Sequence, residues 1–378
     1  MDFRFNAEQT AFRDAVREFA RAELRPHSAS WDREGAIPRD VVRKMAEMGL
    51  VGIRLDPATG GQGADCVTTG IAHEEVAAAD FSAAYFVLMP TLVGEVIQLA
   101  ASPEQRERWL PAICAGESVP ALALTEPDAG SDARNLQMRA ERHGDAYVLT
   151  GEKTSISLGE TADVCVVFAR AEAGITALVV DLHSPGIERR GFRDLGTKAI
   201  GRASLHFDGC EVPVDDRLGE EGQGFRLVMQ AFDYSRALIA LMCLGSAREA
   251  IADAVEHTRQ RTAFGKPLIV NQGVSFPLVE HSTFIEAARL LSYKALWLND
   301  QGLPHTAEAN MVKWWAPRLS VEAIHQSLLF HGHMGYSDEV PQQQRLRDVI
   351  GLEIGDGTAE IAKAVVAREL FGRDYRPY

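Results

Sequence analysis

The stretch LQMRAERHGDAYVL, residues 136–149, decides the fold class of this chain. Apolar residues occupy every second position from Leu136 to Ala140, with polar residues between them. The alternation resumes at Tyr147, after a His-Gly-Asp turn. A period of two is typical of a β-strand that buries one face, so the pattern predicts two strands joined by a tight turn.

The β pattern extends from this hairpin through the middle of the chain. Short apolar segments separated by Gly, Pro and Asp recur at 164–168, 176–180 and 204–207. We therefore expect a compact β domain of sandwich or barrel type over residues 119–222.

On both sides of this block the apolar period is that of a helix. In the amino-terminal part, residues 1–118, Asn6 and Gln9 resemble a capping box that begins a first helix. In the carboxy-terminal part, residues 223–378, a helix from Gln223 is followed by long helical segments near 277–300, 305–330 and 358–371. The order predicts an α+β protein with an amino-terminal helical domain, a middle β domain and a carboxy-terminal antiparallel helical bundle.

Composition excludes several classes of protein. The 378 residues carry 39 basic and 53 acidic side chains, a net charge of −14, and no basic stripe with interleaved aromatics, which argues against a nucleic-acid partner. The chain opens without the features of a signal peptide, and no apolar run approaches ~18 residues, so we expect no membrane attachment and a cytoplasmic location. The five cysteines are scattered and are interpreted as buried thiols. His331 and His333 lie close together without a third ligand nearby, so we expect no metal site.

One acidic residue stands between two glycines inside otherwise helix-forming sequence, in Gly355-Asp356-Gly357. Glycine in a helix costs about 1 kcal/mol relative to alanine, so the pair indicates a tight turn or the close approach of another molecule. Asp356 is therefore the candidate reactive group. The alternative is an ordinary turn in which Asp356 caps the helix from Thr358 onward, and these residues alone leave both readings open.

Three motifs carry a family resemblance. T-E-P-D-A-G-S-D at residues 125–132 resembles the T-E-P-x-A-G-S-D signature of the acyl-CoA dehydrogenases. R-T-A-F-G-K-P-L at 261–268, followed by Gln272, is similar to that family's R-x-x-F-G-x-P segment and its downstream Gln. M-G-Y at 334–336 resembles the start of its closing block, which leads to E-G-T where this chain has D-G-T at 356–358. The resemblance covers almost the whole chain in matching order.

This resemblance implies an activity and an assembly. Family members hold FAD between their domains, assemble as homotetramers, remove the α proton of an acyl-CoA thioester and pass the β hydrogen to flavin N5 as hydride. An electron-transferring flavoprotein usually reoxidises the flavin. By position the base is Asp356, whose backbone N–H would also donate to the thioester carbonyl. Some members place a Glu before the position of Arg236 instead, and Ser235 stands there.

The acid at this position is Asp where most members have Glu. Its side chain is shorter by one methylene, roughly 1.5 Å, so the substrate carbon or the local backbone must lie closer to compensate. Gly355 stands where several members carry Tyr, which leaves space beside the α carbon. A short base and an open pocket suit a branched or cyclic acyl group, and the resemblance is to the alicyclic members that act on cyclohexanecarboxyl-CoA.

The resemblance also assigns residues to ligands. The residues expected to contact FAD within one subunit are Leu122, Leu124, Thr125, Gly130, Ser131, Ser155, Ser157, Thr358 and Glu360. Those expected to reach the FAD of a neighbouring subunit are Arg261, Phe264 and Gln272, with the arginine on the pyrophosphate. Those expected to contact the acyl-CoA are Ser131, Phe232, Asp233, Arg236, Gly355 and Gly357.

Three positions depart from the family pattern. Ser155 replaces the usual Trp, which puts the stacking wall on that flavin face in doubt, while Ser157 is expected at flavin N5 or O4. Leu329 stands for a Gln and His333 for a Gly in a segment that usually contacts the dinucleotide.

Other functions remain compatible with the residues. The same base and flavin could run as an enoyl-CoA reductase, because the sequence does not fix the driving force. An oxidase that passes electrons to oxygen is a further enzyme class. A flavin-binding scaffold without turnover is the alternative outside catalysis.

Overall fold

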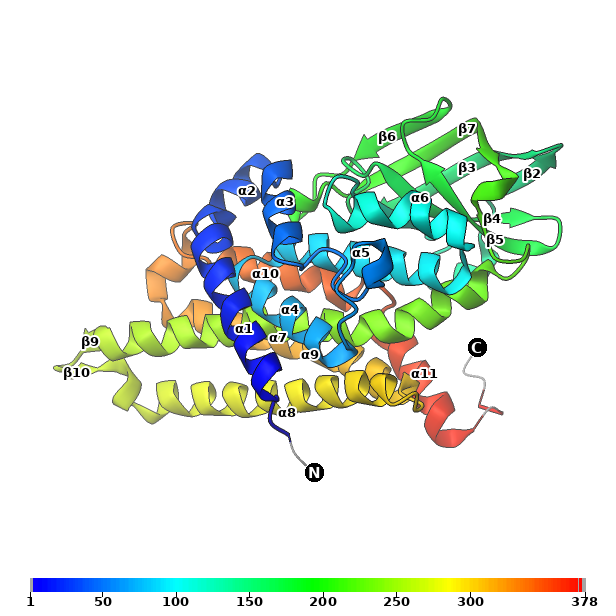
Figure 1. Cartoon of the computed structure of the whole chain (residues 1–378). Helices are drawn as coiled ribbons and strands as arrows, with labels where there is room; N and C mark the ends of the chain where they lie inside the picture. Colours follow the sequence, from blue (N-terminus) through cyan, green and yellow to red (C-terminus); the bar gives the residue numbers. More distant parts are fainter. Residues whose placement is uncertain (1–2, 373, 376–378) are drawn as a thin grey trace.

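The computed structural model describes residues 3–372 and 374–375 and shows helices, then strands, then helices (Figure 1). The amino-terminal helices are α1 (Ala7–Phe19), α2 (Ser28–Glu34), α3 (Arg39–Glu47), α4 (Cys66–Ala79), α5 (Phe81–Ala100) and α6 (Pro103–Cys114). The predicted capping box is confirmed, because Asn6 accepts from the backbone of Gln9 and the Gln9 side chain accepts from the backbone of Asn6. Satisfying these backbone donors fixes the start of α1.

The middle of the chain folds into one eight-stranded sheet. Its strands are β1 (Pro120–Ala123), β2 (Arg139–His143), β3 (Ala146–Ile156), β4 (Val164–Ala171), β5 (Gly174–Asp181), β6 (Ile187–Gly191), β7 (Ala203–Pro213) and β8 (Arg217–Leu218). The hairpin predicted from residues 136–149 is confirmed, since β2 and β3 pair antiparallel from Arg139 opposite Thr150 to His143 opposite Ala146. Strand β1 pairs in parallel with β4.

The carboxy-terminal part is helical again. It contains α7 (Gly224–Gln260), α8 (Gln272–Asp300), α9 (Thr306–Phe330), α10 (Gln342–Ile350) and α11 (Ala359–Phe371), with a small hairpin of β9 (Thr262–Ala263) and β10 (Lys266–Pro267) between α7 and α8. Helix α8 begins five residues before the predicted 277, and α10 was not predicted. The hairpin projects from the far end of the long α7 and α8, away from the sheet (Figure 1).

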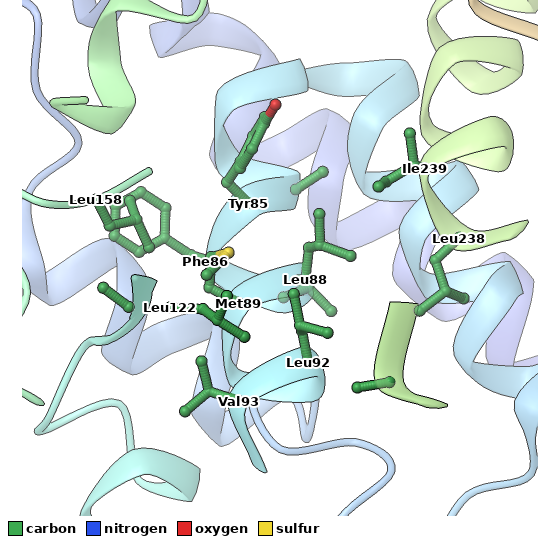
Figure 2. Packing of buried hydrophobic residues seen from close by; sticks show 14 of the residues in the cluster. Tyr85, Phe86, Leu88, Met89, Leu92, Val93, Leu122, Leu158, Leu238 and Ile239 are labelled. Atoms are coloured by element: carbon green, nitrogen blue, oxygen red, sulfur yellow. The ribbon is translucent and has the colours of Figure 1, made fainter. Parts of the chain in front are cut away.

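Helix α5 corrects one expectation from the sequence. It has 20 residues with a mean hydropathy of 1.5, so by length and composition it could cross a membrane. It packs instead in the interior, with 78% of that apolar stretch buried. Figure 2 shows its side chains packed with Leu122 and Leu158 of the β domain and Leu238 and Ile239 of α7. The helix therefore belongs to the core that joins the three parts of the chain.

Candidate active site

Asp356 lies in a strained turn between the end of α10 and the start of α11. Its φ is +56° and that of Gly357 is +95°, so two consecutive residues are left-handed. Asp tolerates this region better than most residues, but a non-glycine residue there still indicates a constrained turn. The cap of α11 is Thr358, whose side chain accepts from the backbone N–H of Ile361 at 3.3 Å. The reading of Asp356 as that cap is therefore wrong.

The side chain of Lys313 is hydrogen-bonded to this turn. It lies on α9 with a side chain that is almost wholly buried, and its Nζ donates to the carbonyl oxygens of Leu352 at 2.8 Å and Gly357 at 2.9 Å. A buried ammonium is costly unless it is hydrogen-bonded, and these carbonyls on either side of Asp356 supply the bonds. The backbone that presents Asp356 is thus tied to the bundle.

A second cation faces Asp356 from α7. Arg236 is buried and donates to Oδ1 of Asp233 at 2.7 Å, while Oδ2 of Asp233 accepts from the hydroxyl of Thr306 at 2.9 Å. Both carboxylate oxygens of Asp233 are therefore engaged within the protein. The network fixes the guanidinium of Arg236 near the base.

The environment of Asp356 suits a general base. Burial raises the pKa of its carboxyl, while the positive charges of Lys313 and Arg236 act to lower it. A raised pKa makes the carboxylate a stronger proton acceptor, and the two cations favour its ionised form. The backbone N–H of Asp356 has no acceptor among the described residues, so this donor remains for a ligand.

The T-E-P segment is braced by a buried ion pair. Lys153 on β3 is fully buried and donates to the carbonyl of Leu124 at 2.9 Å and to the Glu126 carboxylate at 2.8 Å. Glu126 also accepts from the backbone N–H of Met138 at 2.9 Å. Glu126 is therefore a structural residue of the β domain. Thr125 is half-buried and Ser131 is exposed.

The chain matches three domain profiles over nearly its full length. They are the acyl-CoA dehydrogenase amino-terminal domain over residues 6–117, the middle domain over 121–210 and the carboxy-terminal domain over 222–371. The chain belongs to the acyl-CoA dehydrogenase family.

Individual relatives agree with this assignment. A benzylmalonyl-CoA dehydrogenase of Aromatoleum aromaticum is 36% identical over 375 residues, 98% of this chain and 100% of the relative. An NADH-dependent acryloyl-CoA reductase of Anaerotignum propionicum is 35% identical over 381 residues, 99% of this chain and 97% of the relative. The structure of butyryl-CoA dehydrogenase from Megasphaera elsdenii superposes with a TM-score of 0.95 at 32% identity, covering 98% of this chain and 100% of that one. The protein is an FAD-dependent oxidoreductase of this family.

The residues at the dehydrogenase's domain junction fit FAD. The backbone N–H groups of Thr125 and Ser131 and the hydroxyls of Thr125 and Ser157 have no hydrogen-bond partner among the described residues. Such donors suit the carbonyl and nitrogen edge of a flavin ring. A side chain added at Gly130 would meet nothing within 4 Å, so the loop is open there.

Ser155 stands at the position where the family usually has a tryptophan. Ser155 is exposed with a φ of +60°, and its hydroxyl accepts from Arg202 at 2.9 Å. Arg202 also donates to Asp194 and stacks over the ring of Phe192 at 4.4 Å. An arginine rather than an indole therefore stands beside Ser155.

Some expected site residues are not gathered with the others. Arg261, Phe264 and Gln272 lie at the β9–β10 hairpin and the start of α8, far along α7 from Arg236 (Figure 1). Phe264 is fully exposed with a φ of +52°. Their contact with the FAD of a neighbouring subunit stays a prediction.

The remaining positions divide between exposed and buried sites. Leu329, His333 and Glu360 are exposed, while Phe232 and Gly355 are half-buried. His331 is buried, its Nδ1 lies 2.8 Å from the carbonyl of Ser327, and its ring stacks on His257. Within residues 3–372 and 374–375, the structure gathers no group of three His, Cys, Asp or Glu that could hold a metal ion.

Sequence reasoning missed three residues of the candidate site. Lys313 lies between apolar and aromatic residues of α9, Met311, Val312, Trp314 and Trp315, and a charge among such residues is itself a signal. Arg202 belongs to no recognisable sequence motif. Tyr85 was overlooked between the apolar residues that predicted α5, where an aromatic residue is ordinarily core.

Proposed function

We propose that this protein dehydrogenates a cyclic or branched acyl-CoA, of which cyclohexanecarboxyl-CoA is the type, with Asp356 as the base. The observation that carries the proposal is the pairing of a short acid with Gly355. The φ of Gly355 lies outside the left-handed region, so the backbone does not require glycine there. A Cβ at Gly355 would lie 3.3 Å from the backbone oxygen of Gly351 and 3.6 Å from Leu352. The glycine therefore lets the turn pack closely and places no side chain beside the base.

The chain's own residues divide the work of proton removal. The Asp356 carboxylate takes the α proton, and its unpaired backbone N–H donates to the thioester oxygen, where negative charge develops. Burial raises the pKa of this carboxyl, and the charges of Lys313 and Arg236 oppose that rise and so favour the ionised form. FAD, when bound, accepts the β hydrogen as hydride.

The CoA arm has a matching groove beside α7. An open groove of about 610 Å³ is lined by Arg134, Gly222, Phe225, Arg226 and Asp233, among others. The Arg134 guanidinium stacks over the Phe225 ring at 4.8 Å. Two arginines and a half-buried aromatic ring suit the phosphates and the adenine of CoA.

A ring-bearing substrate also has support among the relatives. The benzylmalonyl-CoA dehydrogenase is named for an acyl group that carries a ring. Its sequence aligns with this chain end to end, so the fold accommodates such groups in at least that protein.

The test is anaerobic bleaching of the flavin band by a panel of acyl-CoA thioesters. We expect cyclohexanecarboxyl-CoA to reduce the flavin faster than butyryl-CoA does. The Asp356→Glu variant should reverse this order, because the longer acid reaches further into the space that the ring needs. Reduction by straight-chain thioesters alone, in both proteins, would remove the proposal.

Reduction of an enoyl-CoA is a second candidate. It is favoured by the 35% identity to an acryloyl-CoA reductase, and the same base could return a proton to the α carbon. Dithionite-reduced protein mixed with cyclohex-1-ene-1-carboxyl-CoA would report it as recovery of the oxidised flavin band. Recovery without any reduction by the saturated thioester would assign the reductase direction.

Three finer expectations complete the proposal. We propose that an electron-transferring flavoprotein accepts the electrons, that the protein is a homotetramer in which Arg261 reaches a neighbour's FAD, and that it is cytoplasmic. They are carried by the resemblance of the motifs to the family.

A further inference from the structure

Tyr85 is buried on α5 with its ring in the core and its hydroxyl outside it. The side chain is 94% buried, since 6% of the residue is exposed. In Figure 2 the hydroxyl points away from Phe86, Leu88, Met89 and Leu92, which pack on one another below it. The phenol therefore presents a polar atom at the margin of an apolar cluster.

This hydroxyl has no hydrogen-bond partner among the described residues. The buried Tyr147 donates to Glu221 at 2.7 Å and the half-buried Tyr293 donates to Glu74 at 2.7 Å. The buried Tyr234 also has no partner for its hydroxyl. A buried tyrosine hydroxyl ordinarily finds a partner, because leaving it unpaired costs free energy. The bond that Tyr85 does not make inside the protein is available to a ligand.

Helix α5 packs against α7, which carries Arg236, and against α10, which leads into the turn of Asp356. Burial raises the pKa of the Tyr85 phenol well above its usual value, and Asp356 is the charge that adds most to the rise. Arg202 of the β domain opposes it. The phenol is therefore a neutral donor, near enough to feel Asp356 and not hydrogen-bonded to it. The proposed function puts the acyl group in front of this same carboxylate.

We propose that Tyr85 donates a hydrogen bond to an oxygen carried by the acyl group, so that the preferred substrate is an oxygen-substituted ring or branched acyl-CoA rather than a plain hydrocarbon one. This inference rests on the proposed function. A hydrocarbon acyl group would exclude water from the phenol and leave its O–H unpaired, whereas an ether, hydroxyl or carbonyl oxygen would satisfy it.

The test compares matched thioesters in matched variants of the FAD-loaded protein. The probes are cyclohexanecarboxyl-CoA and its 3- and 4-hydroxy derivatives, scored by the rate constant of anaerobic flavin reduction and by the concentration at half-saturation. We expect wild type to prefer one hydroxylated ring by about 10-fold or more in the ratio of rate to half-saturation. Tyr85→Phe should lower reduction by that thioester and raise or leave unchanged reduction by the plain ring.

Controls separate the possible outcomes. Tyr147→Phe removes a hydroxyl that bonds to Glu221 and should leave the preference intact. Flavin absorbance per protein shows that Tyr85→Phe still binds FAD. An equal loss of rate on every thioester would mean that the phenol acts on the base, and equal rates on all thioesters in wild type would also overturn the inference. If no ring substrate reduces the flavin but butyryl-CoA does, it is the proposed function that fails.

Discussion

Asp356 combines a reactive side chain with a constrained backbone. A left-handed φ at a non-glycine residue costs on the order of 1–3 kcal/mol, and the Lys313 hydrogen bonds on either side help to maintain it. The carboxylate lies near the charges of Lys313 and Arg236, and the backbone N–H of the same residue has no acceptor among the described residues. A single position can then supply the base and a donor to the thioester oxygen.

Replacing this acid should separate activity from stability. We expect Asp356→Asn to slow flavin reduction by about 10²–10⁴-fold or more, because the α proton has no acceptor. Its stability at pH 7 should match or exceed that of wild type. Burial raises the pKa of Asp356 in the folded state above the ordinary 3.8. Between the unfolded-state and the folded-state pKa, folding takes up a proton, so the stability of the wild type declines as the pH rises through that range. Asn cannot ionise and avoids this decline.

The measurements are anaerobic stopped-flow reduction and thermal unfolding from pH 4 to pH 8. Flavin content serves as the control, since the variant should bind FAD as wild type does. Undiminished reduction would place the base elsewhere. A variant that is less stable than wild type at pH 7 and equal to it at pH 4 would contradict the sign of the shift.

At the scale of elements, Lys313 of α9 stabilises the turn that carries Asp356. Lys313→Met should leave the carbonyls of Leu352 and Gly357 unpaired, at a cost of about 1–3 kcal/mol for each that stays buried. It also removes a charge that lowers the pKa of Asp356, so the pH dependence of flavin reduction should move to higher pH. Chemical denaturation and a pH series of reduction rates measure the two effects.

Lys363→Met offers a matched control on α11. Lys363 is exposed and lies over the ring of Trp314 at 5.0 Å, so its loss should change neither stability nor the pH profile by much. If the Lys313 variant loses stability but keeps the wild-type pH profile, the lysine supports the fold without acting on the base.

Most elements follow from local sequence, and the exceptions have physical causes. The Asn6 cap and the alternation from Leu136 act within a few residues, so α1 and the β2–β3 hairpin could be predicted. Helix α10 begins with three glutamines, and its buried Gln342 and Gln344 carry no apolar period. Tyr85 resembles core in sequence because its role depends on groups from distant parts of the chain. Contacts of this kind become visible only in the folded chain.

Helix α10 also carries a buried acid that should make stability depend on pH. Asp348 accepts from the backbone N–H of Thr197 at 2.5 Å, which joins the bundle to the β domain. Burial, with Asp80 and Asp32 nearby, raises the pKa of its carboxyl to about 7, although the Thr197 bond and Arg347 act to lower it. Because the unfolded pKa is near 3.8, wild-type stability should fall as the pH rises from about 4 to about 7.

Asp348→Asn keeps an acceptor for Thr197 and cannot ionise. We expect it to be more stable than wild type above pH 7, by up to about 4 kcal/mol, and similar to it near pH 4. Thermal unfolding of both proteins across this range measures the difference. Asp338→Asn, at an exposed position of the segment before α10, is the control and should follow wild type. A constant difference at every pH would show that the carboxyl does not titrate in this window.

At the scale of the whole molecule, α8 exposes an apolar stripe. Phe276, Leu290 and Trp297 are spaced by multiples of seven residues, which places them on one face of the helix. They are each 42–54% exposed, and Phe284 and Val279 beside them are 49% and 62% exposed. The helix lies along the outside of the bundle and begins next to the projecting hairpin (Figure 1). A contiguous apolar face of this kind is typical of an interface between subunits.

Breaking that face should affect FAD as well as assembly. Phe284→Glu places a charge in the proposed interface, and we expect the variant to sediment as a smaller species than the wild type, for which a tetramer is proposed. If Arg261 and Phe264 hold a neighbour's FAD, the dissociated protein should lose flavin on gel filtration even though Asp356 is untouched. Leu99→Glu, on the exposed end of α5, is the control and should remain assembled and yellow. A wild-type monomer with a full complement of FAD would show that each subunit binds the cofactor alone, and that α8 faces another partner.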